Sequence, residues 1–241
     1  MRQVRPYTLL APYYDELMSH INYEGWSAYI IDNILNYKKN NSRVLEIAAG
    51  TGQMSAYIRK VFSKLYVTEY SPEMLKVNSP KGLAVACDMG SLPFRPLFDA
   101  VYCTFDSVNY VLSKLKLLNL LREINRVLTP GGIFCFDVSL EKNSLKYEKA
   151  VIYNDDLPEA IISQKSCYNR KSRIHYNYFY FASEHGEILY EKHKQKIYPF
   201  EVYRELFIRT GFELLKCYKA FTYKKGKDSD ERVFFIIRKP L

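Results

Sequence analysis

The chain has 241 residues, of which 48% are hydrophobic and 25% charged, a composition typical of a globular protein that buries a sizeable core. Its apolar runs are shorter than the roughly 18 residues that a membrane span needs, and residues 1–6 lead into no signal-peptide core. We therefore expect a cytoplasmic protein without a membrane partner. The net charge of +9 is a modest excess that most often reflects solvated surface.

The five cysteines indicate a reducing compartment and no metal site. They are odd in number, widely spaced and mostly embedded in apolar, strand-like runs. Each is expected to be a small buried hydrophobe, because no Cys or His pair has the spacing of zinc ligands.

The first 140 residues alternate between predicted strands and helices, which is the pattern of a parallel sheet covered by helices. Helices are expected at 8–20 and 24–37, and others begin near Gln53, Pro72 and Ser113. Strands are expected near 43–48, 64–69, 83–87, 98–104 and 132–138. Pro130, Gly131 and Gly132 are predicted to stop the helix that begins at Ser113 and to turn the chain into the last of these strands.

The alternation of predicted strands and helices is interrupted between residues 145 and 198. Residues 172–181 and 187–198 alternate in polarity around a turn at 183–186, which predicts an antiparallel hairpin inserted into the α/β fold. Pro199 then opens a helix that Gly211 closes, and strands near 212–219 and 232–237 complete the chain. The sequence therefore predicts one unit made of 1–144 and 199–241, with 145–198 as a small antiparallel β insert.

The segment from Val44 to Gly52 predicts a buried strand, a tight turn of small residues, and the start of a helix. Small residues let a ligand approach the backbone, and the helix start offers unpaired N–H groups to an anion. Gly50, Gly52 and Ser55 approximate the dinucleotide fingerprint, which leaves a Rossmann oxidoreductase using NAD or NADP as an alternative.

Acidic residues follow the successive predicted strands. Glu46 precedes the turn, Glu69 ends the second strand, and Asp88 with Met89 ends the third. A dinucleotide site gives a role to Glu69, whose carboxylate can accept from both ribose hydroxyls, but none to Glu46 or to Asp88 and Met89. A ligand that joins an adenosine to a free amino acid end uses all of them.

In this context the chain resembles the class I S-adenosylmethionine-dependent methyltransferases. Residues 45–52 (Leu-Glu-Ile-Ala-Ala-Gly-Thr-Gly) are similar to the family's first motif, Glu69 to its second and Asp88-Met89 to its third. Residues 130–132 stand before the family's fifth strand. The stretch 98–110, residues 14–18 and the late insert resemble a bacterial subgroup with a small β cap over the active site. The resemblance implies a Rossmann-like, mostly parallel sheet with an antiparallel last strand, and S-adenosyl-L-methionine as the cofactor.

The resemblance also implies how the nucleoside end of the cofactor is held. Glu69 is expected to bind the ribose diol, and Tyr70 is expected to lie against the adenine. The Asp88 carboxylate should accept from the adenine amino group, while the Met89 N–H donates to the ring.

The amino acid end is expected to rest on the turn formed by Ala48, Gly50 and Gly52, where Ala48 replaces the family's first glycine. The ammonium group should lie near Glu46 and near the carbonyl groups around Cys103 and Thr104.

Methyl transfer needs alignment, exclusion of water and an unprotonated nucleophile, so few catalytic side chains are required. Tyr14 is a candidate for contact with the cofactor's positive sulfur. Asn109 lies in the loop after the fourth strand, where an open α/β sheet places its ligands. His193 faces inward if Lys192, Lys194 and Lys196 face solvent, and it is a candidate general base.

The predicted reaction is transfer of a methyl group to oxygen or nitrogen of a small-molecule acceptor. An RNA or protein acceptor is the main alternative, because the hairpin carries basic residues among tyrosines that could bind phosphates while bases stack. These residues are Arg170, Lys171, Arg173, Lys192, Lys194 and Lys196. A protein that binds the cofactor without transferring methyl groups is a further alternative. The oligomeric state is not predicted.

Overall fold

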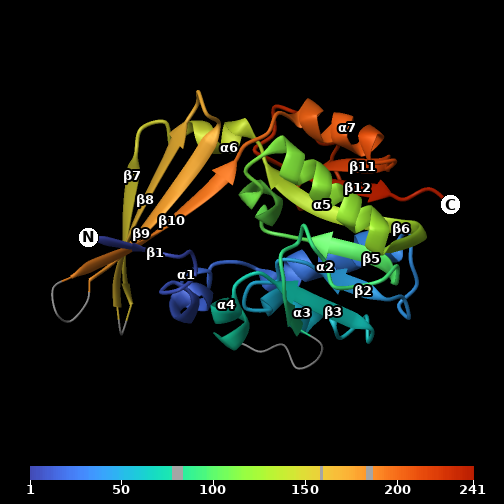
Figure 1. Ribbon diagram of the computed structural model, residues 1–241, viewed down its shortest axis with the longest axis horizontal. Helices are drawn as coiled ribbons and strands as arrows, with labels where there is room; N and C mark the ends of the chain where they lie inside the picture. Colours follow the sequence, from blue (N-terminus) through green and yellow to red (C-terminus); the bar gives the residue numbers. More distant parts are fainter. Residues whose placement is uncertain (78–83, 158–159, 183–186) are drawn as a thin grey trace.

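The computed structural model describes residues 1–77, 84–157, 160–182 and 187–241, whose strands form two sheets (Figure 1). The main sheet has the strand order β11-β12-β6-β5-β2-β3-β4. Its strands are β2 (Val44–Glu46), β3 (Leu65–Glu69), β4 (Ala84–Ala86), β5 (Phe98–Cys103), β6 (Leu128–Ser139), β11 (Glu213–Lys219) and β12 (Arg232–Arg238). Neighbours from β4 to β6 pair in parallel, and β12 is antiparallel to both β6 and β11. The predicted fold class is confirmed.

Helices cover both faces of the main sheet because its central strands are apolar on both sides. On one face, α5 (Lys114–Val127) and α7 (Phe200–Arg209) pack on Phe134, Phe136 and Phe235. On the other face, α2 (Tyr23–Leu35) and α3 (Gln53–Ile58) pack on the alternate residues, such as Ile133 and Phe234. Since side chains alternate along a strand, β6 and β12 supply both cores.

The second sheet, which we call the cap sheet, has the order β1-β10-β9-β8-β7 and stands beside the main sheet in Figure 1. Its strands are β1 (Arg2–Val4), β7 (Val151–Leu157), β8 (Ala160–Asn169), β9 (Ile174–Ala182) and β10 (Ile188–Lys196). The predicted hairpin corresponds to β9 and β10, which pair antiparallel, whereas β7 and β8 were not predicted. The predicted turn at 183–186 lies outside the described residues.

The cap sheet takes one strand from outside the predicted insert. Strand β1 pairs in parallel with β10, and its Arg2 lies opposite Leu189. The following residues reach η1 (Ala11–Tyr13) and α1 (Tyr14–Leu17), where one helix had been predicted over 8–20. The N-terminal residues therefore connect the cap sheet to the main sheet.

The turn predicted at Pro130, Gly131 and Gly132 is a correction. Helix α5 ends at Val127, and β6 begins at the next residue and already contains these three positions. A register shift in the pairing with β5 accommodates them. Phe98 lies opposite Leu128, whereas Ala100, two residues later, lies opposite Ile133, five residues later. Gly131 has a φ of 72°, which a glycine adopts without strain.

The short elements complete the edge where the parallel strands end. They are α4 (Pro72–Val77) after β3, η2 (Ser107–Tyr110) after β5, and α6 (Glu141–Leu145) after β6. None of the described helices is long and apolar enough to cross a membrane.

The aromatic cluster around Phe136 provides a test of the core. Phe136 is fully buried, with ring centroids 4.5 Å from Phe134 and 5.5 Å from Phe235. Phe136→Ala should lower the free energy of unfolding by about 3–5 kcal/mol, measured by urea denaturation, because it leaves a cavity. The control Ile208→Ala removes a side chain that is 80% exposed and should change stability by less than about 0.5 kcal/mol. Equal effects of the two variants would contradict the assigned core.

Candidate active site

A cavity of about 1530 Å³ lies where β2, β3, β4 and β5 end. Three parts of the chain line it: the strand ends of the main sheet, the N-terminal segment (residues 5–14) and the inner face of the cap sheet. The chain proceeds from β2 to β3 and β4 in one direction and from β5 to β6 in the other, so the cavity lies beside the point where the strand order reverses. Open α/β sheets bind ligands at this point.

The turn between β2 and α3 has the backbone that a close ligand requires. Ala48, Gly50 and Gly52 all have positive φ angles, of 55°, 61° and 85°. Ala48 and Gly50 line the cavity. Gly52 caps the start of α3 and contributes to the shape of the turn without lining the cavity.

Glu69 connects the end of β3 to this turn. Its carboxylate accepts from the Gly50 N–H at 2.8 Å and from the Ser71 N–H at 2.8 Å. The side chain is 7% exposed and lines the cavity. Burial raises the pKa of Glu69, and these backbone donors oppose that shift. Each carboxylate oxygen keeps a second lone pair, which suits the predicted binding of a ribose diol.

Glu46 is a buried acid at the end of β2. It is 1% exposed, accepts a hydrogen bond from the Ser55 hydroxyl and lines the cavity. Burial raises the pKa of the Glu46 carboxyl to about 7, although the hydrogen bond from Ser55 opposes the shift. A carboxylate in this position gains from a cationic partner, which the ammonium group of an amino acid end would provide.

The other predicted cofactor residues lie around the same cavity, with one exception. Tyr70, Asp88, Met89 and Thr104 line it, and Tyr70 is 73% exposed, so its ring is free to pack on a ligand. Cys103 is fully buried in β5 and does not line the cavity. Its predicted contact with the ammonium group through the backbone carbonyl therefore stays a prediction.

Two of the three predicted catalytic residues line the cavity. Tyr14 comes from the N-terminal segment, and burial raises the pKa of its phenol well above the ordinary value. His193 comes from β10 and is 1% exposed. The register of β9 and β10 places Lys192 opposite Tyr178 and His193 opposite Asn177, so the lysine and the histidine lie on opposite faces as the alternation predicted.

Asn109 is a correction, because its amide is fully buried, is hydrogen-bonded within the protein and does not line the described cavity. Its Nδ2 donates to the carbonyl oxygens of Ser139 at 3.2 Å and Lys196 at 2.9 Å, and its Oδ1 accepts from the Ser139 N–H at 3.0 Å. The residue therefore positions η2 against β6 and the end of β10, and it is not placed to contact an acceptor.

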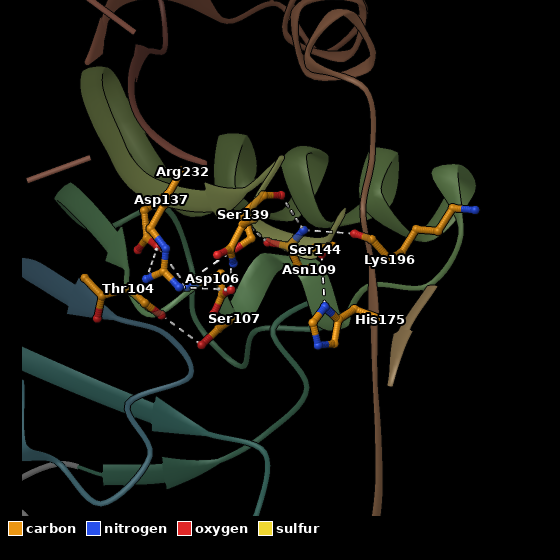
Figure 2. A network of polar contacts seen from close by, with 11 residues as sticks. Thr104, Asp106, Ser107, Asn109, Asp137, Ser139, Ser144, His175, Lys196 and Arg232 are labelled. Carbon is orange, nitrogen blue, oxygen red and sulfur yellow. Dashed lines mark hydrogen bonds and ion pairs between the residues drawn. The ribbon is translucent and has the colours of Figure 1, made fainter. Parts of the chain in front are cut away.

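Arg232 joins Asp106 and Asp137 in a network that the sequence did not reveal (Figure 2). Its guanidinium lies 3.1 Å from an Asp106 oxygen and 3.2 Å from an Asp137 oxygen. Burial raises the pKa of Asp137 to about 6, and Arg232 opposes that shift. One signal for this network was available in the sequence. Because the last strand is antiparallel, β12 begins at the edge where β6 ends, and its Arg232 lies opposite Ser139.

Comparisons with known proteins agree with this geometry. Residues 45–136 match the model of a methyltransferase domain family. YqeM of Bacillus subtilis (strain 168), named as a methyltransferase, is 31% identical over 243 residues, which cover 97% of each chain. The chain belongs to the class I S-adenosylmethionine-dependent methyltransferases. It is thus an enzyme that uses S-adenosylmethionine, and the alternative of a nicotinamide-dependent oxidoreductase is wrong.

Two further matches illustrate the breadth of the family. The chain is 28% identical to a protein of Homo sapiens named for tRNA methyltransferase 9B, over 178 residues that cover 70% of this chain and 37% of the human one. The solved structure of the sugar N-methyltransferase KedS8 from Streptoalloteichus superimposes with a TM-score of 0.77 at 18% identity, covering 95% of this chain and 93% of the other. The latter shows a shared fold.

The position of Glu69 generates a prediction for cofactor binding. Glu69→Ala should weaken binding of S-adenosylhomocysteine by about 2–4 kcal/mol in isothermal titration calorimetry, because two charge-assisted hydrogen bonds to the ribose are lost. Glu205→Ala, which removes a surface carboxylate paired with Lys114, should leave the affinity unchanged. Unchanged affinity in Glu69→Ala would reject the assignment.

The raised pKa of Glu46 predicts a pH dependence of cofactor affinity. Below about pH 7 the free protein holds Glu46 protonated, so binding of the ammonium group must first expel that proton. The affinity for S-adenosylhomocysteine should therefore fall up to about tenfold per pH unit below 7 and change only about twofold between 7 and 8. Glu46→Gln should bind weakly at every pH in this range. A wild-type affinity that does not vary between pH 5.5 and 8 would contradict the role of Glu46.

Proposed function

We propose that this enzyme transfers the methyl group of S-adenosylmethionine to oxygen or nitrogen of a small molecule bound beneath the cap sheet. The cavity carries this proposal. Its volume of about 1530 Å³ exceeds the roughly 300–1,000 Å³ of ordinary small-molecule pockets, which leaves room for an acceptor beside the cofactor. In this proposal, residues 1–144 and 199–241 hold the cofactor, and residues 145–198 form a cap over the acceptor.

The inner face of the cap sheet supports an acceptor that is small and polar. Gln164, Asn177, Phe179 and Gln195 line the cavity from that face together with His193. Neutral amides supply both donors and acceptors, while Phe179 supplies an apolar surface. The fold shared with a sugar N-methyltransferase is consistent with an acceptor of this size and polarity.

The basic residues that suggested RNA lie elsewhere. Lys192 Nζ is 4.9 Å from the ring centroid of Tyr176 and 5.3 Å from that of Tyr178, on the face of the cap sheet opposite His193. Arg173 pairs with Glu141 at 2.6 Å, and Lys196 Nζ donates to the Ser172 carbonyl at 2.7 Å. None of the six basic residues that suggested RNA lines the described cavity: Arg170, Lys171, Arg173, Lys192, Lys194 and Lys196. An acceptor inside the cavity would therefore meet neutral groups of the cap sheet instead.

The assignment is tested by following the methyl group. The enzyme is incubated with S-adenosylmethionine labelled in the methyl group and with a bacterial lysate, which is then separated into small-molecule, RNA and protein fractions. We expect the label in the small-molecule fraction, and Glu69→Ala should abolish most of it. Label that enters the RNA or protein fraction instead would overturn the proposed acceptor class.

A further inference from the structure

Four side chains form a continuous chain of hydrogen bonds in the wall of the cavity. The Tyr7 hydroxyl lies 2.9 Å from the Tyr110 hydroxyl, which lies 3.1 Å from His193 Nδ1. His193 Nε2 in turn lies 2.9 Å from an oxygen of Glu191. The N-terminal segment, η2 and β10 each contribute to this chain, and Tyr7, Tyr110 and His193 line the cavity.

The surroundings of Glu191 fix the direction of these hydrogen bonds. Its carboxylate is fully buried and accepts from the backbone N–H groups of Tyr7 at 2.6 Å, Leu9 at 2.5 Å and Leu10 at 3.0 Å. A carboxylate with these donors acts as an acceptor toward His193, so Nε2 carries the proton and Nδ1 offers a lone pair. Tyr110 therefore donates to Nδ1, and Tyr7 donates to Tyr110.

The end of the chain at Tyr7 is open to an acceptor. The Tyr7 oxygen has used its proton on Tyr110 and keeps lone pairs for a donor in the cavity. Burial raises the pKa values of Tyr7 and Tyr110 well above the ordinary value, so both phenols stay protonated. They can pass a proton onward, and the imidazole is the group that can retain it.

We propose that Tyr7 contacts a hydroxyl group of the acceptor and that its proton leaves through Tyr110 to His193, which makes this enzyme an oxygen methyltransferase acting on a neutral polar compound. The acceptor oxygen forms a bond to the methyl carbon as the carbon–sulfur bond breaks and its electron pair stays on sulfur. The hydroxyl proton moves to Tyr7, the Tyr7 proton to Tyr110, and the Tyr110 proton to His193 Nδ1. Glu191 positions the imidazole and stabilises its positive charge.

The charge distribution in the cavity favours a neutral hydroxyl group as the acceptor over an amine, which would enter as an ammonium ion and have to lose a proton before it could attack. The described cap-side residues that line the cavity include no carboxylate, since Glu191 is fully buried and does not line it. Glu46, Glu69 and Asp88 lie at or just beyond the ends of β2, β3 and β4, and Glu73 in α4 lies 4.0 Å from Arg5. Asp106, which also lines the cavity, is paired with Arg232. This inference rests on the proposed function and adds to it the atom that is methylated.

The hydrogen-bond chain is tested by ¹⁵N NMR of histidine-labelled enzyme bound to S-adenosylhomocysteine. The chain holds 4 histidines, so His193→Gln assigns the signal. We expect an Nε2-protonated ring in neutral solution and a shifted Nδ1 resonance in Tyr110→Phe. The matched control Tyr180→Phe, which removes a hydroxyl from β9, should leave the resonance in place. An Nδ1-protonated ring, or an Nδ1 resonance that is unchanged in Tyr110→Phe, would overturn the proposal.

The chemical outcome is tested with ¹³C-methyl S-adenosylmethionine and the small-molecule fraction of a bacterial lysate. The carbon shift of the product separates O-methyl from N-methyl groups, and we expect O-methyl. Tyr7→Phe, Tyr110→Phe and His193→Gln should each slow its formation by about 100-fold or more. Cofactor affinity should be unchanged, and Tyr180→Phe should retain the wild-type rate.

An N-methyl product, or full activity in Tyr110→Phe, would overturn the relay. By contrast, wild-type enzyme that labels only RNA or protein would contradict the proposed function, while the NMR result would still decide whether the hydrogen-bond chain exists.

Discussion

The site depends on one constraint, which is that parallel strands end at the same edge of a sheet. The order of the main sheet reverses beside β2, so the segments after β2 and β5 diverge and leave space between them. Glu46, Glu69 and Thr104 follow from this arrangement, because each stands at or next to the end of its strand. The carboxylates of Glu46 and Glu69 reach a common cavity because β2 and β3 pair in parallel and end side by side.

A buried carboxylate is costly unless donors compensate for its lost hydration, and this requirement connects the cap sheet to the rest of the protein. Glu191 meets it with three backbone N–H groups of the N-terminal segment and with His193. The N-terminal segment and the cap sheet therefore share one anchor, the Glu191 carboxylate. A displacement of the N-terminal segment or of the cap sheet would therefore also displace the other.

Local patterns explain what could be predicted from the sequence. The turn at residues 48–52 and Glu69 belong to short stretches whose residue types require a particular backbone or ligand, and the alternation of β10 was enough to turn His193 inward. For this reason the residues predicted to bind the cofactor could be picked out from the sequence. The residues proposed to face the acceptor could be picked out only in part.

What was missed depends on contacts between distant segments. Strand β1 pairs with a strand more than 180 residues later, and the bond from the Tyr7 N–H to Glu191 spans 184 residues. Nothing near Tyr7 signals either contact. Asn109 was misjudged for the same reason, because its loop was placed correctly while its partners, Ser139 and Lys196, come from other elements.

The loop after β5 shows how such distant contacts prepare the site. Phe105 and Asp106 have φ angles of 59° and 47°, a left-handed backbone that costs non-glycine residues roughly 1–2 kcal/mol each. The Asp106 N–H donates to Asp137 at 2.9 Å, and Arg232 from the last strand bridges both carboxylates. These bonds offset the strain and fix the start of η2, while Asn109 fixes its end. Tyr110 is then presented to His193 before any acceptor arrives, so binding need not supply the energy to order it.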